Sequence, residues 1–166
     1  MRIFALWAIL TSIIYVLQYS FLPILFTYNG VSVNFMLLLT GSTAFLLGHR
    51  YGVFMGFASG LLQDLTTGSY FGCSIFSYML LGFMFGKFSN HIFKEQFFLP
   101  VFSSIFAAAV HYFIMVMFVY LLGFKLNLQW SLLYTLVPML CYQFAFAYPI
   151  HKLVFEFNNY INKKWK

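Results

Sequence analysis

Few residues in this sequence have the types and spacing that chemistry needs. Its three acidic side chains lie far apart in the chain: Asp64, Glu95 and Glu156. General acid–base catalysis needs an ionisable group within hydrogen-bond reach of the reacting atoms, and a metal site needs His, Cys, Asp or Glu ligands at short spacing. The other candidates have neither a paired carboxylate nor such spacing: His49, His91, His151, Cys73 and Cys141. We therefore expect a protein that is not an enzyme and that binds no metal or other cofactor.

The composition indicates that most of the chain lies in a membrane. Hydrophobic residues make up 63% of the 166 residues, only 7% are charged, and the mean hydropathy is +0.87. A soluble domain carries about 25% charged residues, so this chain lacks the polar surface that water requires. The net charge of +6 does not indicate a nucleic-acid partner, because the basic residues are scattered between apolar runs.

Apolar runs of membrane-spanning length recur along the chain. A helix rises about 1.5 Å per residue, so roughly 20 residues cross the ~30 Å hydrocarbon core. We expect an all-α integral membrane protein whose single domain, residues 1–166, is a six-span helical bundle. Its spans cover residues 3–22, 31–48, 51–67, 70–86, 97–122 and 130–150, followed by a basic tail at 151–166. The connection at His49 and Arg50 is so short that residues 31–67 fit either two full spans, which we favour, or a re-entrant pair.

Basic residues indicate how the chain is oriented, because cytoplasmic loops carry an excess of Lys and Arg. With the N-terminus inside, eight basic residues fall in cytoplasmic segments: Arg2, Arg50, Lys87, Lys94, Lys152, Lys163, Lys164 and Lys166. The outer loops then hold only Lys125. This bias places both termini in the cytoplasm. The first run lacks the small-residue cleavage site of a signal peptide, so we expect it to be a retained span.

In this arrangement Asp64 and His111 lie at a similar depth. Asp64 is 13 residues into its run, and His111 is 14 residues into a run that crosses in the same direction. Both are therefore ~20 Å above the cytoplasmic edge. Two interpretations stay open: a direct pair, since ionisable groups inside a membrane find partners, or an Asp64 that caps a helix or contacts outer-leaflet water. We expect Gln18, Gln63 and Gln143 to join helices through hydrogen bonds.

Glycines recur at four-residue spacing on both sides of Asp64. Positions four apart lie on one face of a helix, and small residues on such a face let membrane helices approach closely. Two roles fit this stripe: packing of the second to fourth spans against one another, or a groove for a partner's helix. The glycines concerned are Gly48, Gly52, Gly56, Gly60, Gly68 and Gly72, with Gly82 and Gly86 on the next span.

These glycines and Asp64 belong to a longer motif between residues 48 and 86. Its positions are Gly56, Phe57, Gly60, Leu61, Leu62, Gln63, Asp64, Gly68, Gly72, Tyr78 and Gly82. The motif resembles the middle of the MreD family of rod-shape-determining proteins, in which Gly-Phe-x-x-Gly-Leu-x-x-Asp precedes further glycines. The chain length and the basic-tailed layout are also similar. The family often opens its second span with Pro followed by Asp or Asn; this chain has Val33 and Asn34, so we expect that entry to differ.

The resemblance implies a non-enzymatic scaffold subunit of the bacterial cell-elongation machinery, which acts in rod shape and peptidoglycan synthesis at the cytoplasmic (inner) membrane. Proteins of this family are associated with MreC, a bitopic membrane protein, and through MreC with the filament protein MreB. A RodA-type glycosyltransferase and a penicillin-binding transpeptidase complete the implied assembly. Short loops and the lack of catalytic groups fit such a scaffold, which would meet its partners and the lipid bilayer mainly through helix faces.

A second function stays open: the substrate-binding subunit of an energy-coupling-factor vitamin transporter, which is also a small six-span protein. Such a subunit needs a polar pocket in its outer half and a row of small residues four apart on its first span. Here the first span has Ala5 and Ala8, which are three apart. A proton-coupled carrier that uses Asp64 and His111 is a third possibility. The side chains available for either site are few: Asp64, Gln63, His111 and Gln18.

Overall fold

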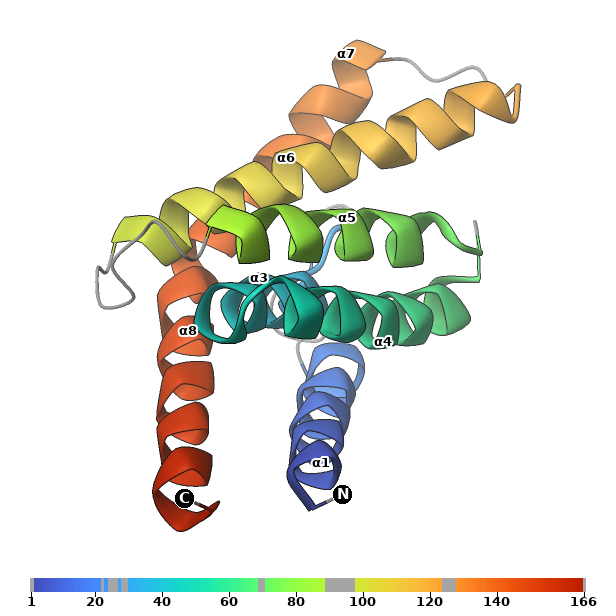
Figure 1. The fold of residues 1–166 in the computed structure, drawn as a ribbon. Helices are drawn as coiled ribbons and strands as arrows, with labels where there is room; N and C mark the ends of the chain where they lie inside the picture. The colour runs from blue at the N-terminus through green and yellow to red at the C-terminus, as the bar shows by residue number, and fades with distance from the viewer. Residues whose placement is uncertain are drawn as a thin grey trace.

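The computed structural model describes residues 2–21, 23, 27, 30–68, 71–88, 98–123 and 128–165, and nearly all of them are helical. They form six helical rods (Figure 1). The first is α1 (Arg2–Val16), continued by the π-helical turn η1 (Leu17–Phe21). Single helices form the next four: α3 (Phe35–Leu47), α4 (His49–Thr67), α5 (Cys73–Phe88) and α6 (Phe98–Leu121). The last rod joins α7 (Leu128–Ser131), the π-helical turn η3 (Leu132–Leu136) and α8 (Val137–Trp165).

The predicted all-helical class is confirmed, and each expected span corresponds to one rod with somewhat different bounds. α3 begins at Phe35 rather than near residue 31, because Asn34 caps it by accepting a hydrogen bond from the Leu37 N–H. The break expected at His49 and Arg50 is instead Gly48 alone, whose φ of 90° suits a residue without a Cβ. Both His49 and Arg50 belong to the first turn of α4.

The helices differ in how well they match a bilayer. Among the described residues, two stretches are long and apolar enough to cross a membrane by length and composition, Pro100–Leu121 and Leu132–Ile161. Leu6–Ser20, Phe35–Leu47 and Cys73–Phe88 are apolar but shorter. The 13 residues of α3 are about 20 Å long, which is less than the ~30 Å hydrocarbon core.

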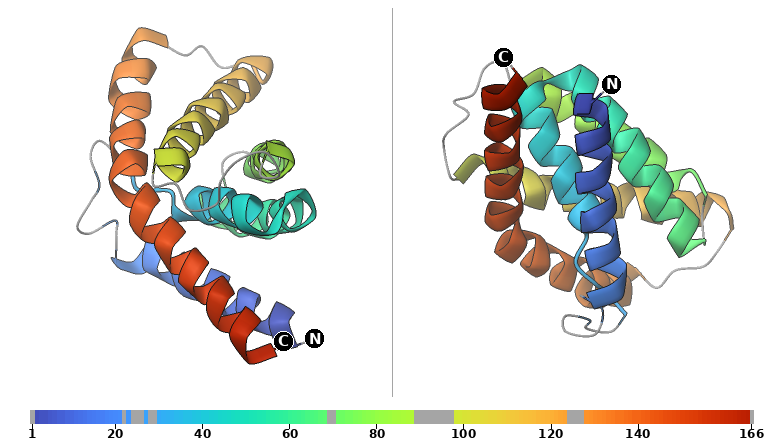
Figure 2. Two further views of the ribbon diagram at one scale, coloured as in Figure 1. Left: turned by 60° about the vertical axis from the view of Figure 1, so that its left-hand side comes forward. Right: turned by 90° about the horizontal axis from the view of Figure 1, so that it is seen from below.

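α3, α4 and α5 form the centre of the molecule, and the other rods pack around them (Figure 1). α4 lies along α5 over much of its length, and α3 folds back on α4 at Gly48. α6 packs on α5, while α8 contacts both α3 and α6. α1 contacts α3 and also meets the far end of α8, where the rings of Trp7 and Phe157 are 5.3 Å apart. The two chain termini therefore lie at the same end of the molecule (Figures 1 and 2).

α3 is the central helix of this arrangement. Eleven of its 13 residues are buried, and a helix that is apolar on all sides is expected to be enclosed by others. Its threonines are accommodated locally, because the hydroxyl groups of Thr40 and Thr43 donate to backbone carbonyls one turn earlier. α3 thus forms the core against which the neighbouring rods pack.

The last rod bends between α7 and α8 (Figure 2). Pro138 has no backbone N–H and so leaves the carbonyl of Tyr134 without its helical donor. The π-helical turn η3 directly precedes it, with the Val137 N–H bonded to the Leu132 carbonyl. Proline and π-turns are the usual causes of helix kinks. The bend lets one rod pack on α6 with its first half and approach α1 with its second.

Residues 151–166, expected as a basic tail, continue α8 without a break to Trp165. Lys152 and Lys163 are exposed residues of that helix. Several residues named in the sequence analysis lie outside the described residues: His91, Lys94, Glu95, Lys125 and Lys166.

Candidate functional site

The glycine stripe forms the contact between α4 and α5. A Cβ built on Gly52 would lie 2.5 Å from the carbonyl oxygen of Gly82, and one on Gly60 would lie 2.5 Å from the Cα of Ile75. Real Cβ atoms do not approach other atoms this closely, and the atoms they would meet belong to backbone, together with the Cβ of Ala44 on α3 in the case of Gly52. Only hydrogen fits at these positions, and the backbones of α4 and α5 therefore touch.

The contact is reciprocal. A Cβ on Gly56 would overlap the backbone of Tyr78, one on Gly82 would overlap Gly52, and one on Gly86 would overlap His49. The groove that these five glycines form is consequently filled by the chain itself. A partner's helix has no room between α4 and α5.

Three glycines expected to line the same groove are turn residues instead. Gly48, Gly68 and Gly72 have φ angles of 90°, 64° and 100°, and a Cβ at each would meet nothing within 4 Å. Positive φ angles favour glycine for reasons of backbone conformation rather than packing. The four-residue spacing continues past the ends of α4, where it no longer describes one helix face.

Asp64 binds the N-terminus of α5. Its carboxylate accepts hydrogen bonds from the backbone N–H groups of Gly72 (2.8 Å), Ser74 (3.1 Å) and Ile75 (3.2 Å). The first N–H groups of a helix have no intrahelical partner, and a side chain at the cap usually binds them. Gly72 has no side chain, so Asp64 of α4 supplies the acceptor. The positive end of the α5 dipole also favours this carboxylate, of which only 4% is exposed.

Asp64 and His111 do not form the direct pair that their equal depth suggested. Among the described residues the only ion pair joins Lys152 and Glu156. His111 is buried against Tyr78, with ring centroids 5.2 Å apart, and its Nδ1 has no hydrogen-bond partner. Of the two interpretations of Asp64, the structure agrees with helix capping, although the capped helix is the following one.

Gln18 joins three rods at the N-terminus of α3. Its Nε2 donates to Oε1 of Gln63 on α4 (3.0 Å), and its Oε1 accepts from the Met36 N–H of α3 (3.0 Å). Asn34 accepts from the Leu37 N–H at 3.1 Å. The first turn of α3, like that of α5, is therefore held partly by a side chain from another helix. Gln18 and Gln63 join helices as expected.

Asn34 and Tyr78 have larger roles than the sequence analysis gave them. The Asn34 side chain donates to the Tyr78 hydroxyl, and Gln143 of α8 donates to the Asn34 carbonyl at 3.1 Å. An asparagine directly before an apolar run is a helix-start signal that could have singled out Asn34. All six rods thus contribute to one set of buried or half-buried polar side chains. We call it the polar layer: Gln18, Asn34, Gln63, Asp64, Tyr78, His111 and Gln143.

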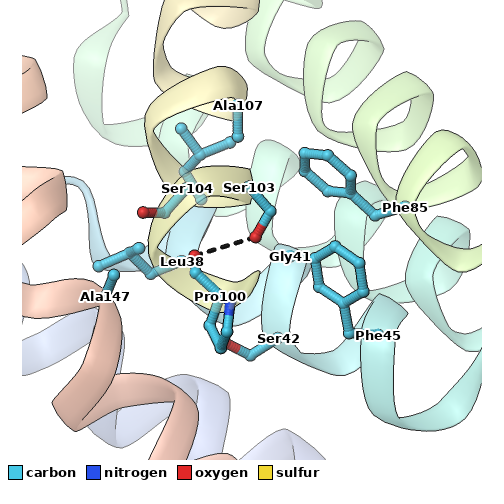
Figure 3. A pocket seen from close by; sticks show the side chains of 11 residues that line it. Leu38, Gly41, Ser42, Phe45, Phe85, Pro100, Ser103, Ser104, Ala107 and Ala147 are labelled. Atoms are coloured by element: carbon cyan, nitrogen blue, oxygen red, sulfur yellow. Dashed lines mark hydrogen bonds between the residues drawn. The ribbon is translucent and has the colours of Figure 1, made fainter. Parts of the chain in front are cut away.

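A small cavity lies between α3, α5, α6 and α8 (Figure 3). Its volume is about 10 Å³, and Leu38, Phe85 and Ala147 are among its lining residues. The hydroxyl of Ser103 donates to the Pro100 carbonyl at 2.9 Å. A single water needs roughly 10–15 Å³, so this cavity holds no more than one water molecule.

These features define a class: a helical membrane protein whose buried polar side chains hold its own helices together. The chain belongs to the MreD family, because the family model described as rod shape-determining protein MreD matches residues 1–161. The resemblance noted at residues 48–86 is thereby confirmed and extends over nearly the whole chain. Family membership indicates a membrane protein with a role in rod-shape determination, and the family is not one of known enzymes. Comparisons with curated proteins and with solved structures gave no match.

Proposed function

We propose that the protein is a non-enzymatic scaffold subunit of the bacterial cell-elongation complex. It spans the cytoplasmic membrane six times with both termini in the cytoplasm. It binds an MreC-like bitopic protein through helix faces within the membrane. Through that protein, or directly, it associates with MreB, a RodA-type glycosyltransferase and a penicillin-binding transpeptidase. Membership of the MreD family supports this role.

The use of the polar layer within the chain is the observation that carries the proposal. A vitamin-binding subunit would need the same side chains to face a ligand. Instead, Asp64 binds three backbone N–H groups of the α5 start, and Gln18 binds Gln63 and the backbone of Met36. Side chains engaged in this way specify how helices pack. This favours a scaffold over a transporter subunit.

The size of the cavity between α3, α5, α6 and α8 argues in the same direction. Small-molecule sites are usually clefts of about 300–1,000 Å³ with a few polar groups. This cavity measures about 10 Å³ and cannot hold a vitamin; the groove of about 620 Å³ between α1 and α4 is within that range of volume, but its lining is mainly apolar.

A partner's helix would meet the outer faces of the rods, because α5 already fills the glycine groove. α6 offers such a face: Phe102 is 67% exposed, Phe113 is 61% exposed and Tyr120 is 77% exposed. Aromatic side chains supply large contact areas at interfaces. We therefore propose that this exposed aromatic face of α6 contacts the membrane helix of the MreC-like partner.

Purification from the native host tests the proposal. The tagged protein is extracted in a gentle detergent, and the proteins that accompany it are identified by mass spectrometry. We expect an MreC-like protein together with the glycosyltransferase and the transpeptidase. Recovery of two ATPases and a membrane transducer, or of a bound vitamin, would overturn the scaffold and favour the transporter subunit.

A further inference from the structure

An apolar groove of about 620 Å³ lies between α1 and α4. α1 contributes the small residues Ala8 and Ser12 to its lining, and α4 contributes Phe54, Phe57, Ala58 and Leu61 among others. We call it the α1–α4 groove. It is separate from the α4–α5 contact, because the glycines of α4 face α5 and not α1.

One end of the groove is closed by two side-chain contacts. Near the C-terminal ends of both helices, Gln18 bonds to Gln63 and the hydroxyls of Tyr15 and Thr66 are 3.3 Å apart. Towards its N-terminus α1 stands clear of α4 (Figure 1). The groove therefore opens towards the end of the molecule where α4 begins.

The length of the groove corresponds to one leaflet of a bilayer. It follows α4 from Tyr51 to Leu62, which is eleven steps of about 1.5 Å, or ~17 Å. Half of the ~30 Å hydrocarbon core is ~15 Å. A membrane-spanning helix of a partner needs the full thickness, and the Gln18–Gln63 bond blocks its path. An acyl chain that enters from one leaflet fits this length.

The positively charged side chain of Arg50 lies near the open end of the groove. Arg50 lies on the same helix face as Phe54, Phe57 and Leu61, at spacings of four, seven and eleven residues. Its side chain is exposed, and no carboxylate among the described residues pairs with it. The described acids are committed elsewhere: Asp64 binds the start of α5, and Glu156 pairs with Lys152. An arginine in this position matches the phosphate of a lipid headgroup.

We propose that the α1–α4 groove binds one acyl chain of an anionic phospholipid whose phosphate is held by Arg50. The apolar lining of the groove accounts for binding of the acyl chain, and the Gln18–Gln63 bond limits how deep the acyl chain can reach. Arg50 accounts for the preference for a negatively charged headgroup. The lipid belongs to the cytoplasmic leaflet in the orientation proposed above, but the site does not depend on the partners of the protein. It would be present in the isolated chain.

Native mass spectrometry of the purified full chain tests the site, with dioleoylphosphatidylglycerol as the anionic probe and dioleoylphosphatidylcholine as the neutral one. We expect one phosphatidylglycerol per chain to survive activation that removes phosphatidylcholine. Arg50→Gln should lower phosphatidylglycerol retention at least fivefold, towards that of phosphatidylcholine. The matched control Lys152→Gln removes an exposed cation on α8 and should leave retention unchanged. Equal retention of the two lipids by the unmodified chain would overturn the proposal.

Filling the groove provides an independent test. Ser12→Phe and Ala58→Phe place a ring in the groove and should abolish retention of both lipids. Ile9→Phe is the matched control on α1. Ile9 is 56% exposed and does not line the groove, so this substitution should leave the retention of both lipids unchanged. Circular dichroism identifies variants that fail to fold, and Ser12→Phe then decides the question if Ala58→Phe is unstable. A photo-crosslinker at Phe57 in native membranes should label lipid; labelling of a protein partner would overturn the lipid assignment.

Discussion

The α4–α5 contact and the outer face of α6 are built from opposite kinds of residue. Between α4 and α5, glycines bring two backbones together so closely that Gly60 meets the Cα of Ile75. On α6, Phe102 and Phe113 leave more than three-fifths of their surface uncovered by the chain. Inside a membrane, lipid tails are as apolar as these side chains, so helix association depends on close packing and hydrogen bonds. The small residues between α4 and α5 specify how the helices pack, and the large residues on α6 form an outer surface that the chain leaves uncovered.

This difference predicts opposite tolerance to substitution. A Cβ added between α4 and α5 meets backbone, which cannot move without shifting a helix. A ring removed from the outer face of α6 leaves space that lipid can fill. The three predictions below test this comparison, beginning with the largest expected effect.

The glycine contact should not accept a larger residue. Gly56→Leu and Gly60→Leu should separate α4 from α5 and cost at least the ~1–3 kcal/mol typical of an overpacked core. Thermal unfolding in detergent, followed by circular dichroism, measures the loss. Gly41 on α3 provides the matched control, because a Cβ there would have its nearest neighbour at 3.8 Å, on the Phe85 ring. Gly56→Ala should therefore lower the melting temperature while Gly41→Ala leaves it unchanged or raises it; equal effects would contradict the comparison.

Asp64 should be the most sensitive member of the polar layer. Asp64→Leu leaves the N–H groups of Gly72, Ser74 and Ile75 without their acceptor, and an unsatisfied buried group costs about 1–3 kcal/mol. Asp64→Asn keeps one acceptor oxygen and should fall between Asp64→Leu and the unmodified chain in melting temperature.

Glu156→Gln supplies the comparison for this series. Its exposed partner Lys152 lies one helical turn away, and such pairs contribute only about 0.3–0.5 kcal/mol. If Asp64→Leu melted at the same temperature as Glu156→Gln, the capping of α5 would have no energetic importance.

The smallest effect on stability is expected on the outer face of α6. Phe102→Ala and Phe113→Ala should change the free energy of unfolding by no more than about 0.5 kcal/mol, as exposed substitutions usually do. Phe45→Ala, which removes a buried ring stacked on Phe85, should cost about 3–5 kcal/mol. Less MreC-like protein should nevertheless co-purify with the α6 variants than with the unmodified chain. Full recovery from both would remove this face from the proposed function.

The positions of the helices follow from the apolar runs, since a run of sufficient length can satisfy its backbone in a membrane only as a helix. The ends are less predictable. α3 begins four residues later than expected because Asn34 provides a cap, and α4 begins at His49 because one glycine suffices for the turn. A charged pair such as His49 and Arg50 looks like a loop in sequence, although its polar atoms can reach past the end of a helix from its first turn.

The contacts of the polar layer were harder to predict than its membership. The sequence singled out Asp64, His111, Gln18, Gln63 and Gln143 as polar residues inside apolar runs, and all of them contribute to the layer, whereas Asn34 and Tyr78 were not given this role. Depth alone suggested His111 as the partner of Asp64. The hydrogen-bond donors to Asp64 prove to be backbone N–H groups eight to eleven residues later, and every residue type except proline carries such a group. No side-chain pattern could reveal them.

The bond between Gln143 and Asn34 has a consequence for how the protein is made. The two residues are 109 positions apart, so Asn34 leaves the ribosome long before the residue that completes its surroundings. During this interval the Asn34 carbonyl, at the beginning of α3, accepts from the Leu38 N–H but lacks its second hydrogen bond, which comes from the last rod. Insertion of the early helices therefore precedes completion of the centre. A chain that ended before α8 would lack the hydrogen bond from Gln143, and its incomplete centre would be open to the proteases and chaperones that act on newly inserted membrane proteins.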